Sequence, residues 1–300
     1  MRDQHPTWGP RKLKALLPPE PAYQQLSLST LAAILRRHGR VDRQEAAKHK
    51  PWRRFQAAAP NDLWQMDFKG HFPLLQGGRC HPLTVLDDHS RFLLGLRACP
   101  NETGLTARAQ LTQIFRCYGL PQVLLMDNGS PWGSDWEHPY TPLTVWLLRL
   151  GIVTSHSRAY HPQTLGKDER LHRTLNEELL ANHPFLDLGD SQRHFDPWRE
   201  VYNCQRPHEA LAMSVPASRY RPSPRGFPEQ LPPIEYGPEY VVRKVQAQGE
   251  VYLHGRRFKI GNAFRGYPVG LRPTTTNGLL DVFFCRQHVA QINLKADNDG

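Results

Sequence analysis

The middle of the chain alternates strand-like segments with helix-like ones, and this alternation restricts the possible folds more than any other feature. In segment 63–68 large apolar side chains occupy every second position, which places Asp67 opposite the main apolar face. The continuous apolar run 123–126 is typical of a strand covered on both faces, and Asp127 follows it directly. We therefore expect an α/β fold with polar groups at the ends of neighbouring strands.

Further segments continue the alternation. Leu171, Leu175 and Leu179 recur at helical spacing and predict the buried stripe of a long helix. Glu169 lies two positions before Leu171, about 200° around that helix, so we expect its side chain to face outward. The other expected strands are 81–86, 92–98 and 152–155, and the expected helices are about 103–118, 141–150, 162–181 and 191–202.

The first 58 residues contain two short helices separated by prolines. The first is expected at about 8–17 and the second at about 28–38, where Ser27 or Ser29 can cap it and Gly39 can end it. This arrangement is similar to a helix-turn-helix, although an ordinary helical hairpin would have the same pattern. The basic side chains that favour DNA here are Arg36, Arg37, Lys48, Lys50, Arg53 and Arg54.

The last third of the chain changes character at a proline-rich stretch, 216–238, which predicts an extended linker. Five short strands punctuated by glycine follow and predict a small β-barrel. They are expected at 240–245, 251–260, 269–272, 280–285 and 289–294. The predicted domains are 1–58, 59–215, the linker 216–238, and 239–296.

The charge of the chain is unevenly distributed. The formal net charge is +10, which favours a polyanionic partner such as nucleic acid. Residues 1–60 hold 12 basic and 4 acidic side chains, whereas residues 61–190 hold 11 basic and 14 acidic ones. An acidic middle between basic flanks is expected of an enzyme whose carboxylate-rich catalytic centre is held on DNA by basic segments. Solvated charge on unrelated surfaces would give the same pattern.

The cysteines and the N-terminal residues indicate the cellular compartment of the protein. The five cysteines are widely scattered, without the paired spacing of a zinc site or a disulfide framework. Polar and basic residues follow Met1, and no apolar run is long enough to span a bilayer. We therefore expect a cytoplasmic protein without membrane association.

Three carboxylates occupy positions suited to metal chemistry: Asp67, Asp127 and Glu169. Each residue also has an ordinary explanation. Asp67 could be a surface residue of an edge strand, Asp127 could form a turn, and Glu169 could be a solvated charge on a helix. If they cluster, their mutual repulsion calls for a cation, and hard oxygen ligands suit Mg²⁺ or Mn²⁺. Two such ions can promote both hydrolysis and strand transfer in phosphoryl chemistry.

Several motifs resemble bacterial insertion-sequence transposases that have a retroviral-integrase catalytic core of the DDE type. The strongest match is 157–175, where a Tyr-His-Pro-Gln-Thr segment leads into a helix with an acidic residue directly before Arg170. The resemblance implies an RNase H-like α/β core with a helix-turn-helix-like segment before it and a small β-barrel after it. The other matching stretches are 8–13, 61–70, 85–91, 126–129 and 203–211.

The resemblance also implies the activity and the residues that carry it. It identifies Asp67, Asp127 and Glu169 as both catalytic and metal-binding, and it favours Glu169 over the adjacent Asp168. The implied function is metal-dependent DNA cleavage and strand transfer with two Mg²⁺ or Mn²⁺ ions. A homo-oligomer is expected to carry it out on element-end and target DNA at the bacterial nucleoid. Further DNA contacts are expected from His161, Lys167, Arg170 and Arg173, although solvated helix charge is an almost equal alternative for the last three. The basic side chains of the C-terminal strands predict DNA contacts from Arg256 and Arg257, with a folded appendage without a DNA role as the alternative.

The chain departs from the family pattern in two respects. Asp127 and Glu169 are 42 positions apart, more than is usual, and we assign the excess to a loop at 131–142. The N-terminal region also begins abruptly, which suggests a truncated or internally started copy. Two other functions stay open: a DNA-binding descendant that no longer does chemistry, and a metal-dependent nuclease without joining activity.

Overall fold

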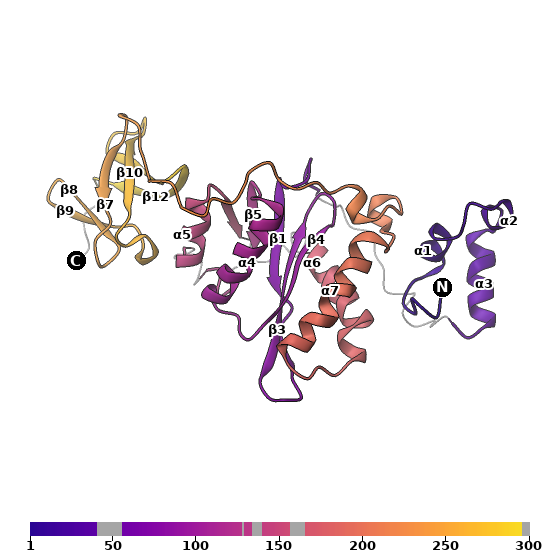
Figure 1. The fold of residues 1–300 in the computed structure, drawn as a ribbon. Helices are drawn as coiled ribbons and strands as arrows, with labels where there is room; N and C mark the ends of the chain where they lie inside the picture. Colours follow the sequence, from indigo (N-terminus) through magenta and orange to yellow (C-terminus); the bar gives the residue numbers. More distant parts are fainter. Residues whose placement is uncertain (41–55, 128, 134–139, 157–165, 296–300) are drawn as a thin grey trace. The chain divides into compact units, whose positions relative to one another are not determined.

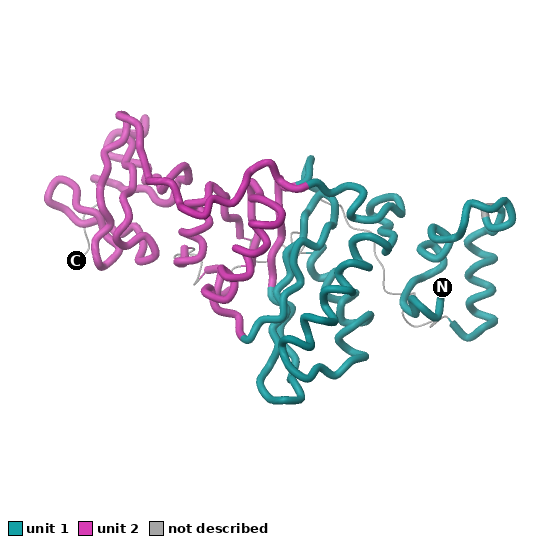
Figure 2. Tube along the Cα trace, in the orientation of Figure 1, with its two compact units in different colours: residues 1–60, 68–100, 162–221 teal, residues 61–67, 101–161, 222–300 magenta. Residues whose placement is uncertain are grey.

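The computed structural model describes residues 1–40, 56–127, 129–133, 140–156 and 166–295 (Figure 1). The chain forms two compact units, each built from segments that are distant in sequence (Figure 2). Unit 1 comprises residues 1–60, 68–100 and 162–221, and unit 2 comprises residues 61–67, 101–161 and 222–300. The predicted domain limits remain a prediction. Within the described ranges, no helix combines the length and the apolar character needed to cross a membrane.

The N-terminal part of unit 1 contains both predicted helices. The second begins where predicted, because the Ser27 hydroxyl accepts a hydrogen bond from the Thr30 amide at 3.0 Å. Trp8 and Leu13 are buried. A third, short helix occupies the proline-rich break. The helices are α1 (Pro10–Ala15), α2 (Pro21–Gln24) and α3 (Leu28–Arg37).

The rest of unit 1 packs helices on an antiparallel sheet, whose strands are β2 (Phe72–Pro73), β3 (Arg79–Asp87) and β4 (Leu93–Cys99). The helices are α6 (Gly166–Glu178), η2 (Leu180–Asn182) and α7 (Leu188–Cys204). Two residues of the predicted stripe, Leu171 and Leu175, are buried on α6. The third, Leu179, follows the end of the helix and is partly buried, so the predicted helix ends about three residues too late. Asn203 on α7 accepts from the Leu93 amide at 2.8 Å and donates to the Leu93 carbonyl at 3.0 Å, which fastens α7 to β4. Two short 3₁₀ helices, η3 (Glu209–Leu211) and η4 (Pro216–Ser218), follow α7.

One buried and one half-buried histidine, His208 and His172, are expected to make unit 1 sensitive to acid. Burial, reinforced by nearby cations, lowers the pKa of His172 to about 4 and that of His208 to about 3. An unfolded histidine titrates near ~6.5. The unfolded chain therefore binds more protons below that pH, and the free energy of unfolding falls as the pH drops from about 6.5 towards 4.

We expect urea unfolding to report a loss of ~2 kcal/mol for each of the two histidines between pH 7.5 and pH 5. The variant His172→Gln should flatten this pH dependence, whereas a matched change at the exposed His71 should leave it unchanged. Equal pH profiles for the wild type and His172→Gln would contradict the assignment.

Between residues 61 and 156, the described part of unit 2 contains a parallel sheet and two α-helices. Its strands are β1 (Leu63–Phe68), β5 (Val123–Met126) and β6 (Val153–His156), with β5 paired to both of the others. The helices are α4 (Gly104–Tyr118) and α5 (Pro142–Arg149). Side-chain caps explain where both begin, since Thr103 and Thr141 accept hydrogen bonds from the amides of Thr106 and Thr144. The predicted alternation of strands and helices is confirmed.

Most of the proline-rich segment belongs to unit 2 and contacts the loops that precede β5 and β6. The Arg225 guanidinium donates to the carbonyls of Pro121, Leu150 and Gly151 at 2.5, 3.1 and 2.9 Å. Gly119 has a φ of +75°, and a Cβ there would lie 2.7 Å from the Arg225 carbonyl oxygen, so this crossing requires glycine. The prediction of an extended linker therefore missed these specific contacts.

The C-terminal strands form open sheets, which corrects the expected barrel closure. The four-stranded sheet has the order β12-β11-β10-β7, and β8 and β9 form a separate hairpin. One predicted strand, 251–260, is broken by a tight turn in which His254 and Gly255 have φ values of 49° and 75°. The strands are β7 (Val241–Lys244), β8 (Glu250–Leu253), β9 (Arg256–Lys259), β10 (Pro268–Pro273), β11 (Leu279–Phe284) and β12 (Gln287–Asn293), with η5 (Asn262–Phe264) between β9 and β10.

Candidate active site

Asp67 and Asp127 occupy equivalent positions on adjacent parallel strands of unit 2. The register of β1 and β5 pairs Leu63 with Val123 and Gln65 with Leu125. Continuing it by two residues places Asp67 level with Asp127, which directly follows β5. Neighbouring strands lie about 4.8 Å apart, and level residues face the same side, so the two carboxylates share one edge of the sheet. Both residues are half-buried, as a group that binds an external ligand requires.

The backbone around Asp127 holds its carboxylate in place. Oδ1 accepts a hydrogen bond from the Gly129 amide at 3.0 Å, and a Cβ at Gly129 would lie 3.2 Å from Oδ2. Burial raises the pKa of Asp127, the Gly129 amide and His156 oppose this shift, and Glu102 adds to it. Since desolvation disfavours the ionised form, a cation beside Asp127 would be stabilising.

His156 is a neighbour of this site that the sequence interpretation missed. It pairs with Met126 at the end of β6, and its Nδ1 lies 2.8 Å from the Asp127 carbonyl oxygen. With the proton on Nδ1, the ring donates this hydrogen bond and orients the residue that carries the carboxylate. A polar residue closing the strand next to β5 was the signal that could have identified it.

The first turn of α6 separates the two competing acids. Asp168 is buried, with 1% of its surface exposed, and its charge acts on Lys167 and Tyr202 within unit 1. Glu169 is exposed, as predicted. Of the two, Glu169 is therefore the one accessible to an external ligand. Its grouping with Asp67 and Asp127 stays a prediction.

His172, one turn after Asp168, is half-buried, and its Nε2 lies 2.9 Å from the Thr84 hydroxyl on β3. This contact anchors α6 to the sheet of unit 1.

Lys167, an expected DNA contact, is bonded inside the protein. Its ammonium donates to the Asp88 carboxylate and, at 3.3 Å, to the Asp88 carbonyl. Asp88 is completely buried and also accepts the Ala57 amide at 2.7 Å. Burial lowers the pKa of Lys167 to about 8, and the hydrogen bond to Asp88 opposes that shift. The pair connects the start of α6 to the turn between β3 and β4.

The other expected DNA contacts differ in accessibility. Arg36 and Arg37 are exposed at the end of α3, and Arg170 and Arg173 are exposed on α6. These four can reach a phosphate backbone without breaking a buried interaction. The expected contacts Lys48, Lys50, Arg53, Arg54 and His161 lie outside the described residues.

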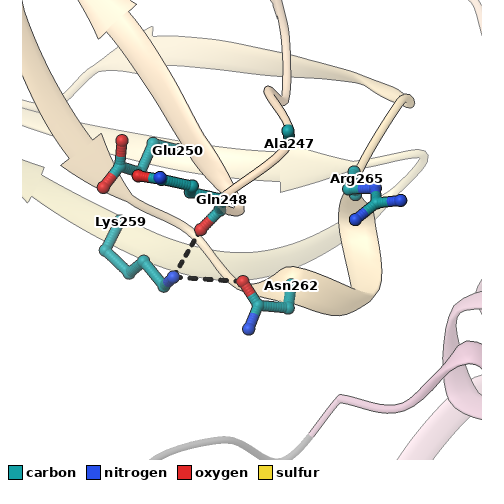
Figure 3. A pocket seen from close by; sticks show the side chains of 6 residues that line it. All are labelled: Ala247, Gln248, Glu250, Lys259, Asn262 and Arg265. Carbon is teal, nitrogen blue, oxygen red and sulfur yellow. Dashed lines mark hydrogen bonds between the residues drawn. The ribbon is translucent and has the colours of Figure 1, made fainter.

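In the C-terminal region, Arg257 is exposed, whereas Arg256 donates to the Leu294 carbonyl at 2.6 Å and lies over the ring of Phe258. A hollow nearby has mixed charge, and Figure 3 shows its Lys259 turned toward Gln248 and Asn262, to which it donates hydrogen bonds. The hollow is lined by Ala247, Gln248, Glu250, Lys259, Asn262 and Arg265. Its lysine is committed to these internal bonds, so the hollow is a poorer candidate than the aspartate pair.

Comparison with protein families assigns three parts of the chain. Residues 57–162 and residues 150–216 each match an integrase core domain. Residues 240–300 match the C-terminal domain of IS481 family transposases. These matches lie on the segments that carry Asp67, Asp127 and Glu169 and on the C-terminal sheets.

Curated relatives include insertion-element and retroviral proteins. The chain is 28% identical over 159 residues to the "Insertion element IS407 uncharacterized 31.7 kDa protein" of Burkholderia multivorans, covering 53% of this chain and 55% of the relative. It is 27% identical over 161 residues to the IS476 39.2 kDa protein of Xanthomonas euvesicatoria, covering 54% and 44%. It is 31% identical over 132 residues to the Gag-Pol polyprotein of feline leukemia virus, covering 44% and 7%. The chain thus spans about half the length of the insertion-element relatives.

Two solved structures are similar to the chain at low identity. One is a chain of the simian T-cell lymphotropic virus intasome in complex with the PP2A regulatory subunit B56 gamma, with 16% identity, a TM-score of 0.46 and 91% coverage of both chains. The other is the HTLV-2 integrase catalytic core domain in complex with magnesium, with 16% identity, a TM-score of 0.41 and coverage of 55% of this chain and 100% of that one.

Proposed function

We propose that the chain is a transposase that cuts and joins DNA with the help of divalent metal ions, because parts of it match an integrase core domain and the C-terminal domain of IS481 family transposases. The observation that carries the proposal is the register of β1 and β5, which places Asp67 on β1 level with Asp127 directly after β5. Its substrates would be the ends of a mobile element and target DNA in the bacterial nucleoid. Joining two ends calls for a homo-oligomer on DNA.

The ligand chemistry of the site fits magnesium or manganese. Asp67 and Asp127 offer only hard oxygen ligands, which suit these ions better than softer metals. The raised pKa of Asp127 supports the fit, because a cation would restore the ionised carboxylate. When bound, a pair of such ions supplies charge neutralisation to the attacking and leaving oxygens of an in-line phosphoryl displacement.

The residues of the chain would bind the metal ions, orient the metal ligands and contact the DNA. Asp67, Asp127 and Glu169 would hold the ions, and Gly129 and His156 would keep Asp127 oriented. Exposure favours Glu169 over the buried Asp168 as the third ligand. Arg170 and Arg173 carry positive charge on the same helix as Glu169, so we infer that they contact the phosphate backbone of the DNA. The DNA contact expected of Arg257 is supported by its exposure alone.

The direct test incubates the protein with DNA from the flanks of its own gene and Mg²⁺, followed by assays for strand cleavage and for joining to a second duplex. We expect both products, and we expect neither with a chelator present. Cleavage without joining would favour the nuclease. DNA binding without either product, in Mg²⁺ and in Mn²⁺, would favour a DNA-binding descendant without chemistry.

The exposed cations at the end of α3 are expected to contribute to DNA affinity. Each phosphate contact adds about 0.9 to the slope of log affinity against log salt concentration, because counterions are released. The variant Arg36→Gln/Arg37→Gln should therefore weaken binding and flatten the slope by about 1 to 2. The control Arg11→Gln should change the slope less, since Arg11 lies 3.6 Å from Glu209. An unchanged slope in the double variant would sink this assignment.

A further inference from the structure

A second set of metal-ligating side chains lies at the connection between α6 and α7. His183 follows η2, Asp190 lies in the first turn of α7, and His194 lies one turn later on the same helix face. One ligand atom from each of the three lies within 4.8 Å of the others. We propose that His183, Asp190 and His194 bind one transition-metal ion, of which zinc is the best fit, at a site separate from the catalytic carboxylates.

Packing fixes these residues without a ligand. The ring of His183 lies against that of His194, with centroids 4.1 Å apart, and Phe185 contacts both rings edge-on. Phe185 is buried, and its carbonyl accepts a hydrogen bond from the Leu75 amide at 2.9 Å. The connection is therefore anchored in the core of unit 1, so a metal ion would find its ligands already gathered.

Hydrogen bonds behind the ligands have the pattern common in metal sites. Nδ1 of His194 lies 2.9 Å from the Asp190 carbonyl oxygen, and when it donates this bond Nε2 is left to bind a metal. Asp190 Oδ2 accepts the Leu186 amide at 3.0 Å, which orients the carboxylate. Oδ1 lies 3.2 Å from the exposed side chain of Arg193 and 3.6 Å from Nδ1 of His194, so a carboxylate oxygen already faces an imidazole of the set.

The donor set selects the class of metal. Two imidazole nitrogens and one carboxylate oxygen are typical zinc ligands, whereas Mg²⁺ prefers oxygen alone. In a tetrahedral zinc site the ligand atoms are roughly 3.3 Å apart, given bonds of about 2.0 to 2.1 Å, so the half-exposed histidines would draw together slightly. Their exposed side leaves room for water as the fourth ligand.

The bound ion would close a short loop between the helix that carries Glu169 and the helix fastened to β4. Residues 183–194 would then be cross-linked through side chains as well as by the backbone. Any ligand that binds the folded state alone raises the unfolding temperature. We therefore expect zinc to stabilise the protein independently of DNA and of the catalytic reaction.

The test uses the full-length Asp127→Asn protein, stripped of metal, so that the catalytic carboxylates do not dominate binding. Zinc chloride is titrated by calorimetry, and the unfolding temperature is measured with and without zinc. Cobalt(II), which gives visible absorption bands in tetrahedral sites, reports the geometry. We expect one equivalent to bind, an increase in unfolding temperature, and tetrahedral cobalt bands.

Three single variants in the same background decide the outcome. His183→Asn and His194→Asn should each weaken zinc binding at least about tenfold and abolish the zinc-dependent rise in unfolding temperature. His71→Asn is the matched control, because His71 also contacts another histidine, His81, at 5.1 Å and should leave zinc affinity unchanged. Unfolding temperatures without metal show that the variants fold. Equal zinc affinity in all three variants, or no binding by the parent protein, would overturn the proposal.

Discussion

Replacing Asp127 by Asn is expected to lower DNA cleavage and joining by at least about 100-fold while DNA binding survives. The change preserves size and removes the anionic ligand at the end of β5. Asp67→Asn and Glu169→Gln should have the same effect. DNA affinity should persist because the exposed cations, such as Arg36, Arg37 and Arg257, are elsewhere on the chain. Single-turnover cleavage and a separate binding assay measure the two quantities.

Combining the substitutions provides a sharper test of joint metal binding. If Asp67 and Asp127 hold the same ions, the double variant should be little worse than either single variant, because residues that act as a unit are not additive. Multiplying losses would instead indicate independent roles. Full Mg²⁺-dependent activity in all of the variants would falsify the catalytic assignment.

Asp168→Asn is the control for the third ligand. Asp168 is buried, so its replacement should lower stability more than it alters the chemistry of the folded protein. The comparison must be made at a temperature where both variants are folded. If Asp168→Asn abolished cleavage under those conditions and Glu169→Gln remained active, the assignment of Glu169 would be wrong.

Replacing Asp88 by Ala is expected to destabilise the protein by about 3 to 5 kcal/mol, because it leaves the ammonium of Lys167 without its partner in a largely buried position. It also removes the acceptor of the Ala57 amide. Urea unfolding measures the loss. Asp281→Ala is the control: its partner His288 is half-exposed, so the expected cost is below about 1 kcal/mol.

A second substitution separates the ion pair from the other effects. Lys167→Met in the Asp88→Ala background removes the unpaired charge and should restore a large part of the lost stability. If the two substitutions gave additive losses in the free energy of unfolding, the contribution of Lys167 to stability would not depend on its ion pair with Asp88. In that case its expected role at the DNA backbone would regain support.

Local patterns in the sequence predicted most of the elements. Alternation placed Asp67 opposite the apolar face of β1, and the stripe through Leu171 and Leu175 oriented Glu169 outward. Ser27, one of the two predicted caps, marks the start of α3, because its side chain satisfies a free amide three positions later. The turn at His254 was missed because a non-glycine residue at positive φ carries no clear sequence signal.

The sequence by itself therefore determined the order of strands and helices. It also determined the face of β1 on which Asp67 lies and the face of α6 on which Glu169 lies, because the two- and 3.6-residue periods of the backbone set these faces. Only the tertiary structure decided which residues meet across long separations. It paired Lys167 with Asp88, brought Arg225 onto Pro121, and placed Asp67 level with Asp127. Such contacts depend on strand register and on the packing of distant segments, which no local period encodes.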